Sequence, residues 1–82
     1  MIQKIVLERL RQDLKWGPVA SIPKDRTPEH WLAILMEEIG EVSEAVVELA
    51  AGEADWEHSL ETELIQSAAV IVSWLEWREI NG

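Results

Sequence analysis

The sequence has 82 residues, and its 16 acidic and seven basic residues give a formal net charge of −9 at pH 7. A surface this negative repels phosphate backbones and anionic lipid headgroups, so we expect neither a nucleic acid nor a membrane as partner. The absence of Cys excludes disulfides and thiolate zinc sites. The amino terminus has no signal-peptide pattern and no apolar run reaches the ~18 residues of a membrane span. We therefore expect a cytoplasmic protein.

Residues 1–82 are predicted to form one domain, since the chain has no linker and no internal repeat. A domain of this length buries only roughly 60–65% of its unfolded surface, so its stability alone is expected to be marginal. The chain has five Trp but no Phe and no Tyr, which concentrates its large apolar surface in a few side chains. We expect part of that surface to contact another subunit.

The first predicted helix covers residues 2–15. Its apolar residues fall mainly on one side of a helix: Ile2, Ile5, Val6, Leu7, Leu10 and Leu14. Gly17 can supply a left-handed cap, and Pro18 blocks continuation of the helix. Residues 18–26 contain two prolines and no periodic pattern, which predicts a loop.

Thr27 and Pro28 predict the start of a second helix, as its N-cap and its first helical position. This helix is expected to run to about Ala50 or Ala51. Its predicted apolar stripe consists of Trp31, Leu35, Ile39, Val42, Val46 and Leu49. Gly52 then allows a short turn, which predicts that the next helix is antiparallel to this one.

The third predicted helix runs from about Trp56 to Ile80, with Asp55 or Ser59 as its N-cap. It contains the longest charge-free run of the chain, Leu64 to Leu75, which covers every face of a helix. Two other short helices cannot bury all of these faces, so oligomerisation is predicted. The expected fold is all-α, with long antiparallel second and third helices that complete a helical bundle by oligomerisation.

Glutamates fall on apolar faces of both long helices. Glu38 lies near the stripe of the second helix, and Glu63 shares a stripe with apolar residues of the third. A carboxylate among core positions costs several kcal/mol unless something pairs with it. Glu41 and Gln66 each follow one of these acids by three residues, so two antiparallel helices can bring the four side chains together. Two other acids of the second helix point away and are expected to be solvated: Glu44 and Glu48.

An oxygen-rich pocket of this kind, with neither Cys nor a paired His, favours Mg²⁺ or Mn²⁺. Without a cation, the like charges would raise the pKa values of the carboxyl groups. We predict a metal site with these ligands: Glu38, Glu41, Glu63 and Gln66. An ordinary solvated surface is the alternative for any single Glu. A carboxylate-bridged di-iron site is set aside, because such sites use Glu-x-x-His pairs.

The pattern Glu37-Glu38-x-x-Glu41, followed on the next helix by Glu63-x-x-Gln66, resembles the EExxE…ExxD signature of the MazG-like, all-α nucleoside triphosphate pyrophosphohydrolases. The flanking blocks ERLRQDLKWG, HWLAILMEEIGEVSEAVVE and ELIQSAAVIVSWLE are similar to a compact subgroup of this family. The resemblance covers nearly the whole chain.

This resemblance implies hydrolysis of a nucleoside triphosphate between the α and β phosphates, with Mg²⁺ required. It implies that Glu38, Glu41 and Glu63 bind the metal. Glu37 is then a further ligand, a residue that supports the ligands without contacting the metal, or a group that orients or deprotonates the attacking water. The last acid of the signature is Gln66 here, which can coordinate through its amide oxygen but brings no charge. This departure leaves weakened, altered or lost catalysis open.

Substrate-binding candidates lie at the end of the first helix. Trp16 is a candidate to stack on the base, with Gln12 one turn away as a hydrogen-bonding partner, because this placement resembles the RQ…KWG block of the family. A core or interface position is the alternative for this Trp. Lys15 is a candidate for binding phosphate oxygens, with ordinary surface charge as the alternative. Three further cations are candidates for the same role: Arg11, Lys24 and Arg26.

The expected function is that of a Mg²⁺-dependent nucleoside triphosphate pyrophosphohydrolase of nucleotide-pool clean-up, acting as a homodimer or homotetramer. The alternative is a non-catalytic helical oligomerisation or regulatory module that keeps the scaffold. Gln66 keeps this alternative open. The remaining tryptophans are expected in the core or at a subunit interface: Trp31, Trp56, Trp74 and Trp77.

Overall fold

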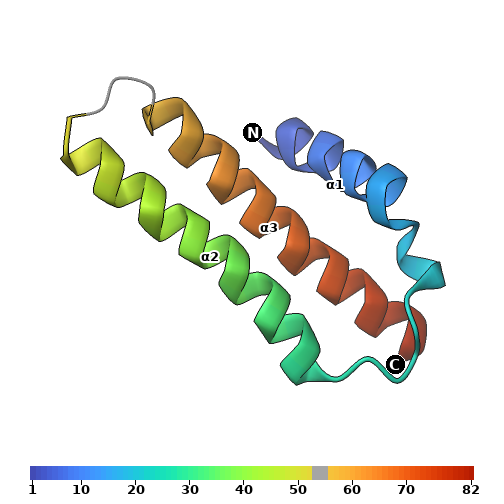
Figure 1. The fold of residues 1–82 in the computed structure, drawn as a ribbon. Coiled ribbons are helices and arrows are strands. Elements are labelled where there is room, and N and C mark those ends of the chain that lie inside the picture. The colour runs from blue at the N-terminus through green and yellow to red at the C-terminus, as the bar shows by residue number, and fades with distance from the viewer. Residues whose placement is uncertain (53–55) are drawn as a thin grey trace.

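The structure is a computed structural model that describes residues 1–52 and 56–82, without the side chains of residues 56–58. The described residues form the α-helices α1 (Ile2–Trp16), α2 (Pro28–Ala50) and α3 (Trp56–Asn81), and a 3₁₀-helix, η1 (Val19–Ser21) (Figure 1). This part of the chain contains no β-strand, which confirms the predicted all-α class. No helix within it has the length and apolar character needed to cross a membrane.

Helix α1 ends where Gly17 adopts a φ of 91°, a conformation that L side chains rarely take. The Gly17 N–H donates to the Asp13 carbonyl oxygen at 2.9 Å. The ψ of Gly17 is 159°, so this residue is outside the left-handed helical region and the predicted left-handed cap is not formed. Glycine still ends the helix, because this extended conformation with positive φ is essentially restricted to it.

The start of α2 follows the predicted capping chemistry. Thr27 is the N-cap, and its Oγ1 accepts a hydrogen bond from the His30 N–H at 3.1 Å. Pro28 occupies the first helical position, where a missing N–H costs nothing. For α3, the candidate N-cap Asp55 lies outside the described residues. Ser59 lies inside the helix and is therefore not its N-cap.

Tryptophans connect the start of α2 with the last turns of α3. The Trp31 ring stacks on Trp74 with ring centroids 6.0 Å apart and an interplanar angle of 5°. It also contacts Trp77 at 5.8 Å in a tilted arrangement. Trp77 Nε1 donates to the Pro23 carbonyl oxygen at 3.1 Å, which attaches the loop between η1 and α2 to α3. Helix α3 lies beside α2 and also contacts α1 and η1 (Figure 1).

The buried face of α2 is rotated from the predicted stripe. Trp31 and Ala45 are buried and Glu38 is half-buried, whereas Ile39 and Val46 of the predicted stripe are exposed. The rotation arises because α3 packs against the side of α2 that carries Glu38. Apolar periodicity does not distinguish this side from the neighbouring apolar side, since α2 has apolar residues on both.

Much of the apolar surface stays exposed in the single chain. On α3, three residues of the long charge-free run are exposed: Leu64, Ile71 and Leu75. On α1, most of the large apolar residues are exposed and the buried residue is Arg9. The predicted burial of the whole α3 run is therefore not achieved within one chain.

Candidate metal centre and adjoining cavity

Three glutamates meet where α2 and α3 pack together. One carboxylate oxygen from each of Glu38, Glu41 and Glu63 lies within 4.8 Å of the other two. Glu38 and Glu41 are one turn apart on α2, and Glu63 comes from α3. Ligand oxygens on opposite sides of a Mg²⁺ ion are roughly 4 Å apart, so a small adjustment of these side chains suffices to surround one ion. The structure thus brings together three of the four predicted ligands.

Burial and mutual repulsion disfavour ionisation of this cluster. The pKa of Glu63 is raised from its ordinary value of 4.5 to about 7, chiefly by burial and further by a hydrogen bond with Glu41 and by the Glu41 charge. Burial also raises the pKa of Glu38, as do the charges of Glu41 and Glu8, while the Arg11 charge lowers it. In the absence of a cation, Glu38 and Glu63 therefore retain protons to a higher pH than isolated carboxyl groups do.

Two oxygens of the cluster are buried without a hydrogen-bond partner in the described part of the chain: Glu38 Oε2 and Glu63 Oε2. Leaving a buried oxygen unpaired is costly, whereas a cation can contact both atoms. Oxygen donors from three carboxylates are the ligands that Mg²⁺ and Mn²⁺ prefer. The donor set therefore fits a hard divalent ion.

The other two residues of the predicted acid signature lie on the same two helices as the cluster. Gln66 is half-buried on α3, one turn beyond Glu63. Glu37 is exposed on α2, and it lines the same cavity as its neighbour Glu38. Glu37 is therefore exposed to the cavity that Glu38 also lines.

A cavity of about 380 Å³ adjoins the cluster and is lined by all three α-helices. This volume falls within the usual range for small-molecule sites. Two of the predicted substrate-binding residues, Gln12 and Trp16, line it. Lys15 instead lies over the Trp16 ring, with its Nζ 4.8 Å from the ring centroid. The end of α1 thus brings a polar, an aromatic and a cationic side chain to the cavity region.

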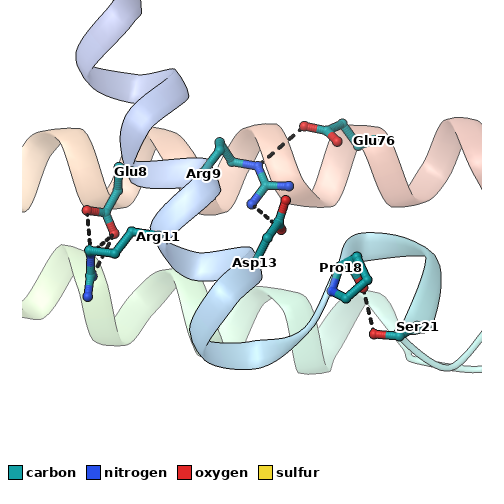
Figure 2. A network of polar contacts seen from close by, with 7 residues as sticks. All are labelled: Glu8, Arg9, Arg11, Asp13, Pro18, Ser21 and Glu76. Atoms are coloured by element: carbon teal, nitrogen blue, oxygen red, sulfur yellow. Dashed lines mark hydrogen bonds and ion pairs between the residues drawn. The ribbon is translucent and has the colours of Figure 1, made fainter.

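Arg9 is a cavity residue that the sequence interpretation missed, because its position on the polar side of α1 indicated solvent. Only 8% of its side chain is exposed. Arg9 Nη1 donates to Asp13 Oδ1 at 3.0 Å and Arg9 Nε donates to Glu76 Oε1 at 3.3 Å (Figure 2). The i, i+4 spacing of Arg9 and Asp13 indicates an ion pair. It does not indicate burial, which depends on α3 packing over the pair.

Two of the other predicted cations are also close to the site. The Arg26 guanidinium lies over the Trp31 ring at 4.8 Å and lines the cavity. Arg11 forms a bidentate ion pair with Glu8, at 2.9 Å and 2.7 Å (Figure 2). Lys24 is exposed in the loop before α2. Arg26 therefore brings positive charge to the cavity, and the nearby Arg11 charge lowers the pKa of Glu38 in the acidic cluster.

The site as a whole combines an anionic cluster that fits a cation with a cavity that has a large aromatic ring, hydrogen-bonding side chains and basic groups. These are the groups that bind a flat ring and a phosphate chain carried by a divalent ion. Comparisons of the chain with models of known protein families, with curated proteins and with solved structures found no match.

Proposed function

We propose that the protein is a Mg²⁺-dependent pyrophosphohydrolase that cleaves a nucleoside or deoxynucleoside triphosphate between the α and β phosphates, giving the monophosphate and pyrophosphate. The observation that carries this proposal is the meeting of Glu38, Glu41 and Glu63 beside a cavity of small-molecule size. The resemblance of the acid signature to that of the MazG-like enzymes supports it.

Glu38, Glu41 and Glu63 would hold the ion, and the amide oxygen of Gln66 would add a neutral ligand. The buried, unpartnered oxygens of Glu38 and Glu63 support this assignment. Mn²⁺ has the same preference for oxygen ligands and is a possible substitute. When bound, the ion offsets the negative charge of the triphosphate and polarises a phosphoryl oxygen.

Glu37 is the proposed general base. It is exposed, adjoins Glu38 and lines the cavity, so a water molecule can reach it there. Its carboxylate would accept a proton from the attacking water, whose oxygen would bond to the α phosphorus while the bond from that phosphorus to the α–β bridging oxygen breaks. The leaving pyrophosphate keeps the electrons of that bond, and basic side chains near the cavity stabilise its charge.

The end of α1 would bind the rest of the substrate. The Trp16 ring is mostly exposed but lines the cavity, which leaves one of its faces available for stacking on a base. Gln12 would hydrogen-bond to the edge of that base. Lys15 and Arg26 would contact phosphate oxygens. Each lies over a tryptophan ring, Trp16 and Trp31 respectively, and both rings line the cavity.

We further propose that α2 and α3 act as an antiparallel pair and that a homodimer or homotetramer completes the bundle. Exposed apolar side chains on all three helices support association. A chain of this size has little internal core, so contacts between subunits would supply much of its stability.

The activity is tested by measuring pyrophosphate release from a panel of ribo- and deoxyribonucleoside triphosphates with Mg²⁺ or Mn²⁺. We expect release by the wild type and a loss of at least ~100-fold in kcat for Glu38→Gln, because the variant removes a charged ligand. Glu79→Gln is the matched control, since Glu79 is exposed near the end of α3. Absence of release by the wild type with every substrate and ion would contradict the enzyme proposal.

A non-catalytic module remains the second candidate, and the uncharged Gln66 is the observation that favours it. Such a module would bind nucleotide and Mg²⁺ without turnover. Calorimetric titration with a non-hydrolysable triphosphate analogue, in parallel with the release assay, separates the two functions. Binding without release by the wild type would favour the module.

A further inference from the structure

Helix α1 turns its apolar side to solvent. Apart from Trp16 at the end of the helix, its exposed large apolar residues are Ile2, Val6, Leu7, Leu10 and Leu14, of which Leu14 is 90% exposed. The polar side of α1 faces inward, where Arg9 is held by Asp13 and Glu76. An amphipathic helix is normally stabilised by burying its apolar side, so this orientation indicates that another surface covers α1.

Helix α2 has a second uncovered apolar side, away from Trp31, Glu38 and Ala45. Its exposed large apolar residues recur at helical spacing: Leu32, Met36, Ile39, Val46 and Val47. Because Leu32, Met36 and Ile39 are separated by four and three residues, they form a continuous stripe on one face. The chain thus carries two separate apolar helix faces of similar length.

The exposed area matches what a dimer of this chain needs. The chain exposes 5845 Å². A compact monomer of 82 residues exposes about 5000 Å², so the excess is roughly 800 Å². Each partner in a standard protein interface buries ~800 Å². One interface of ordinary size would therefore bring the exposed area to that of a compact protein.

The charges of the two helices are complementary. Helix α1 contains four of the seven Lys and Arg residues of the chain and only two acidic residues. Helix α2 contains six glutamates and neither Lys nor Arg. Within the chain, Lys4 pairs with Glu61, Arg11 pairs with Glu8, and Arg9 faces inward, so most α1 cations already have acidic partners. The comparison therefore rests on net charge: two copies of α2 would bring two strongly negative helices together, whereas α1 has a net positive charge. Net charge favours α1 over a second α2 as the occupant of the α2 face.

We propose that the apolar side of α1 in one copy docks on the exposed apolar side of α2 in a second copy. A twofold axis repeats the contact, so that each copy uses both faces and no apolar helix face on α1 or α2 is left over. This interface is independent of the proposed catalysis. The interface would also support α1 on its apolar side. Helix α1 carries the cavity residues Gln12 and Trp16.

Sedimentation equilibrium on single variants tests which faces are used. Leu10→Gln on α1 and Ile39→Gln on α2 each place a polar amide in the contact, and we expect each to raise the dimer dissociation constant about tenfold. Leu75→Gln is the matched control, since Leu75 is as exposed on α3 as Leu10 is on α1. A wild type that is still monomeric at about 100 μM, a concentration on the order of the Kd of weak complexes, would overturn the proposal. A dimer that is weakened only by Leu75→Gln would overturn it as well.

A charge substitution distinguishes contact with α1 from contact between two α2 helices. Glu29 lies seven residues before Met36 and so on the same side of α2. We expect Glu29→Gln to weaken the dimer roughly 2- to 5-fold relative to Glu79→Gln, because an attraction to α1 cations is lost. Glu79→Gln corrects for the general effect of one negative charge fewer. A dimer strengthened by Glu29→Gln relative to this control would indicate contact between α2 helices and overturn the proposal.

Cross-linking gives direct evidence, since the chain has no native Cys. Leu10→Cys is mixed in turn with four α2 variants: Leu32→Cys, Met36→Cys, Ile39→Cys and Val46→Cys. We expect at least one of these mixtures to form a disulfide-linked heterodimer under mild oxidation. Circular dichroism verifies that each variant is folded. If Leu10→Cys cross-links only with itself, and with none of the four α2 variants, the proposed pairing is wrong.

Discussion

Glu63 shows how a single side chain links the candidate site to stability. Its pKa is about 7 in the folded chain and has an ordinary value of 4.5, chiefly because the carboxyl group is buried. The folded state therefore binds a proton that the unfolded state releases between these two values. The resulting stabilisation is fully present below pH 4.5 and is lost as the pH rises through about 7.

We predict that the metal-free protein is less stable at pH 8 than at pH 5, by an amount on the order of 1–3 kcal/mol. Urea denaturation in the presence of EDTA measures the free energy of unfolding at each pH. In Glu63→Gln, which cannot ionise, most of this difference should disappear. An unchanged pH dependence in the variant would show that other groups cause it.

Gln66 is the residue at which the chain departs from the signature it resembles, and Gln66→Glu restores an acid there. We predict effects of opposite sign with and without Mg²⁺. Without the ion, a further carboxylate beside Glu63 increases repulsion and lowers the melting temperature by several °C. With millimolar Mg²⁺, the variant should show a larger thermal stabilisation than the wild type, because an ionised ligand binds the ion more tightly.

Differential scanning fluorimetry across a Mg²⁺ titration measures both effects. Glu79→Gln provides a control for changes in net charge outside the cluster. If Mg²⁺ stabilises neither the wild type nor Gln66→Glu, even with nucleotide present, the acidic cluster is not a metal site.

At the scale of the elements, the tryptophan contacts determine how the loop before α2 lies against the cavity. Trp77 Nε1 donates to the Pro23 carbonyl oxygen, and the same ring contacts Trp31. The loop also carries Arg26, whose guanidinium lies over Trp31. The loop before α2 therefore forms one end of the cavity, and the side chains of Trp31 from α2 and Trp77 from α3 hold this loop in place.

Trp77→Phe removes the hydrogen bond to Pro23 and keeps an aromatic ring. We predict a loss of about 1–2 kcal/mol in the free energy of unfolding, because the Pro23 carbonyl loses its partner and the smaller ring packs less well. If the cavity binds nucleotide, the affinity should fall as well, since the loop carries Arg26. Urea denaturation and fluorescence titration with a labelled nucleotide measure the two effects.

A matched comparison for this variant is Thr27→Ala, which removes the N-cap of α2 but leaves the Trp77 contact in place. It is expected to cost about 1 kcal/mol. Similar losses of stability but a loss of nucleotide affinity only in Trp77→Phe would show that the loop contact positions the cavity. Equal affinities in the two variants would contradict that role.

At the scale of the whole molecule, the chain is elongated, with extents of 44 × 26 × 18 Å, and it has a small buried core. Among the residues whose side chains are described, five apolar ones are buried: Val19, Trp31, Ala45, Ala69 and Val70. A core of this size supplies little net stability, so association is expected to contribute to folding.

We therefore predict that the melting temperature rises with protein concentration. If folding is coupled to dimerisation, a hundredfold increase in concentration adds about 2.7 kcal/mol of association free energy per dimer, which corresponds to a shift of several °C. Calorimetric scans at several concentrations measure this shift. Leu10→Gln should reduce it, and a melting temperature independent of concentration for the wild type would show that the monomer is stable by itself.

Local sequence determined the helices of this protein. Thr27, Pro28 and Gly17 mark boundaries that the structure confirms, because caps and breakers act through backbone atoms only a few residues away. The meeting of Glu38 and Glu63 was also predictable, since acids on apolar faces of neighbouring helices have few other ways to be accommodated. These inferences needed only spacing along the chain.

Only the tertiary structure decided which side of each helix is covered. The pattern of α1 shows an apolar and a polar side, and it predicts burial of the apolar one. The structure instead buries Arg9 and exposes Leu10 and Leu14, because α3 supplies Glu76 as a partner for the guanidinium. The cavity beside Glu38 likewise depends on three helices meeting. The periodic pattern shows that a helix has an apolar and a polar face. Which helix or side chain packs on each face depends on residues far away in the chain.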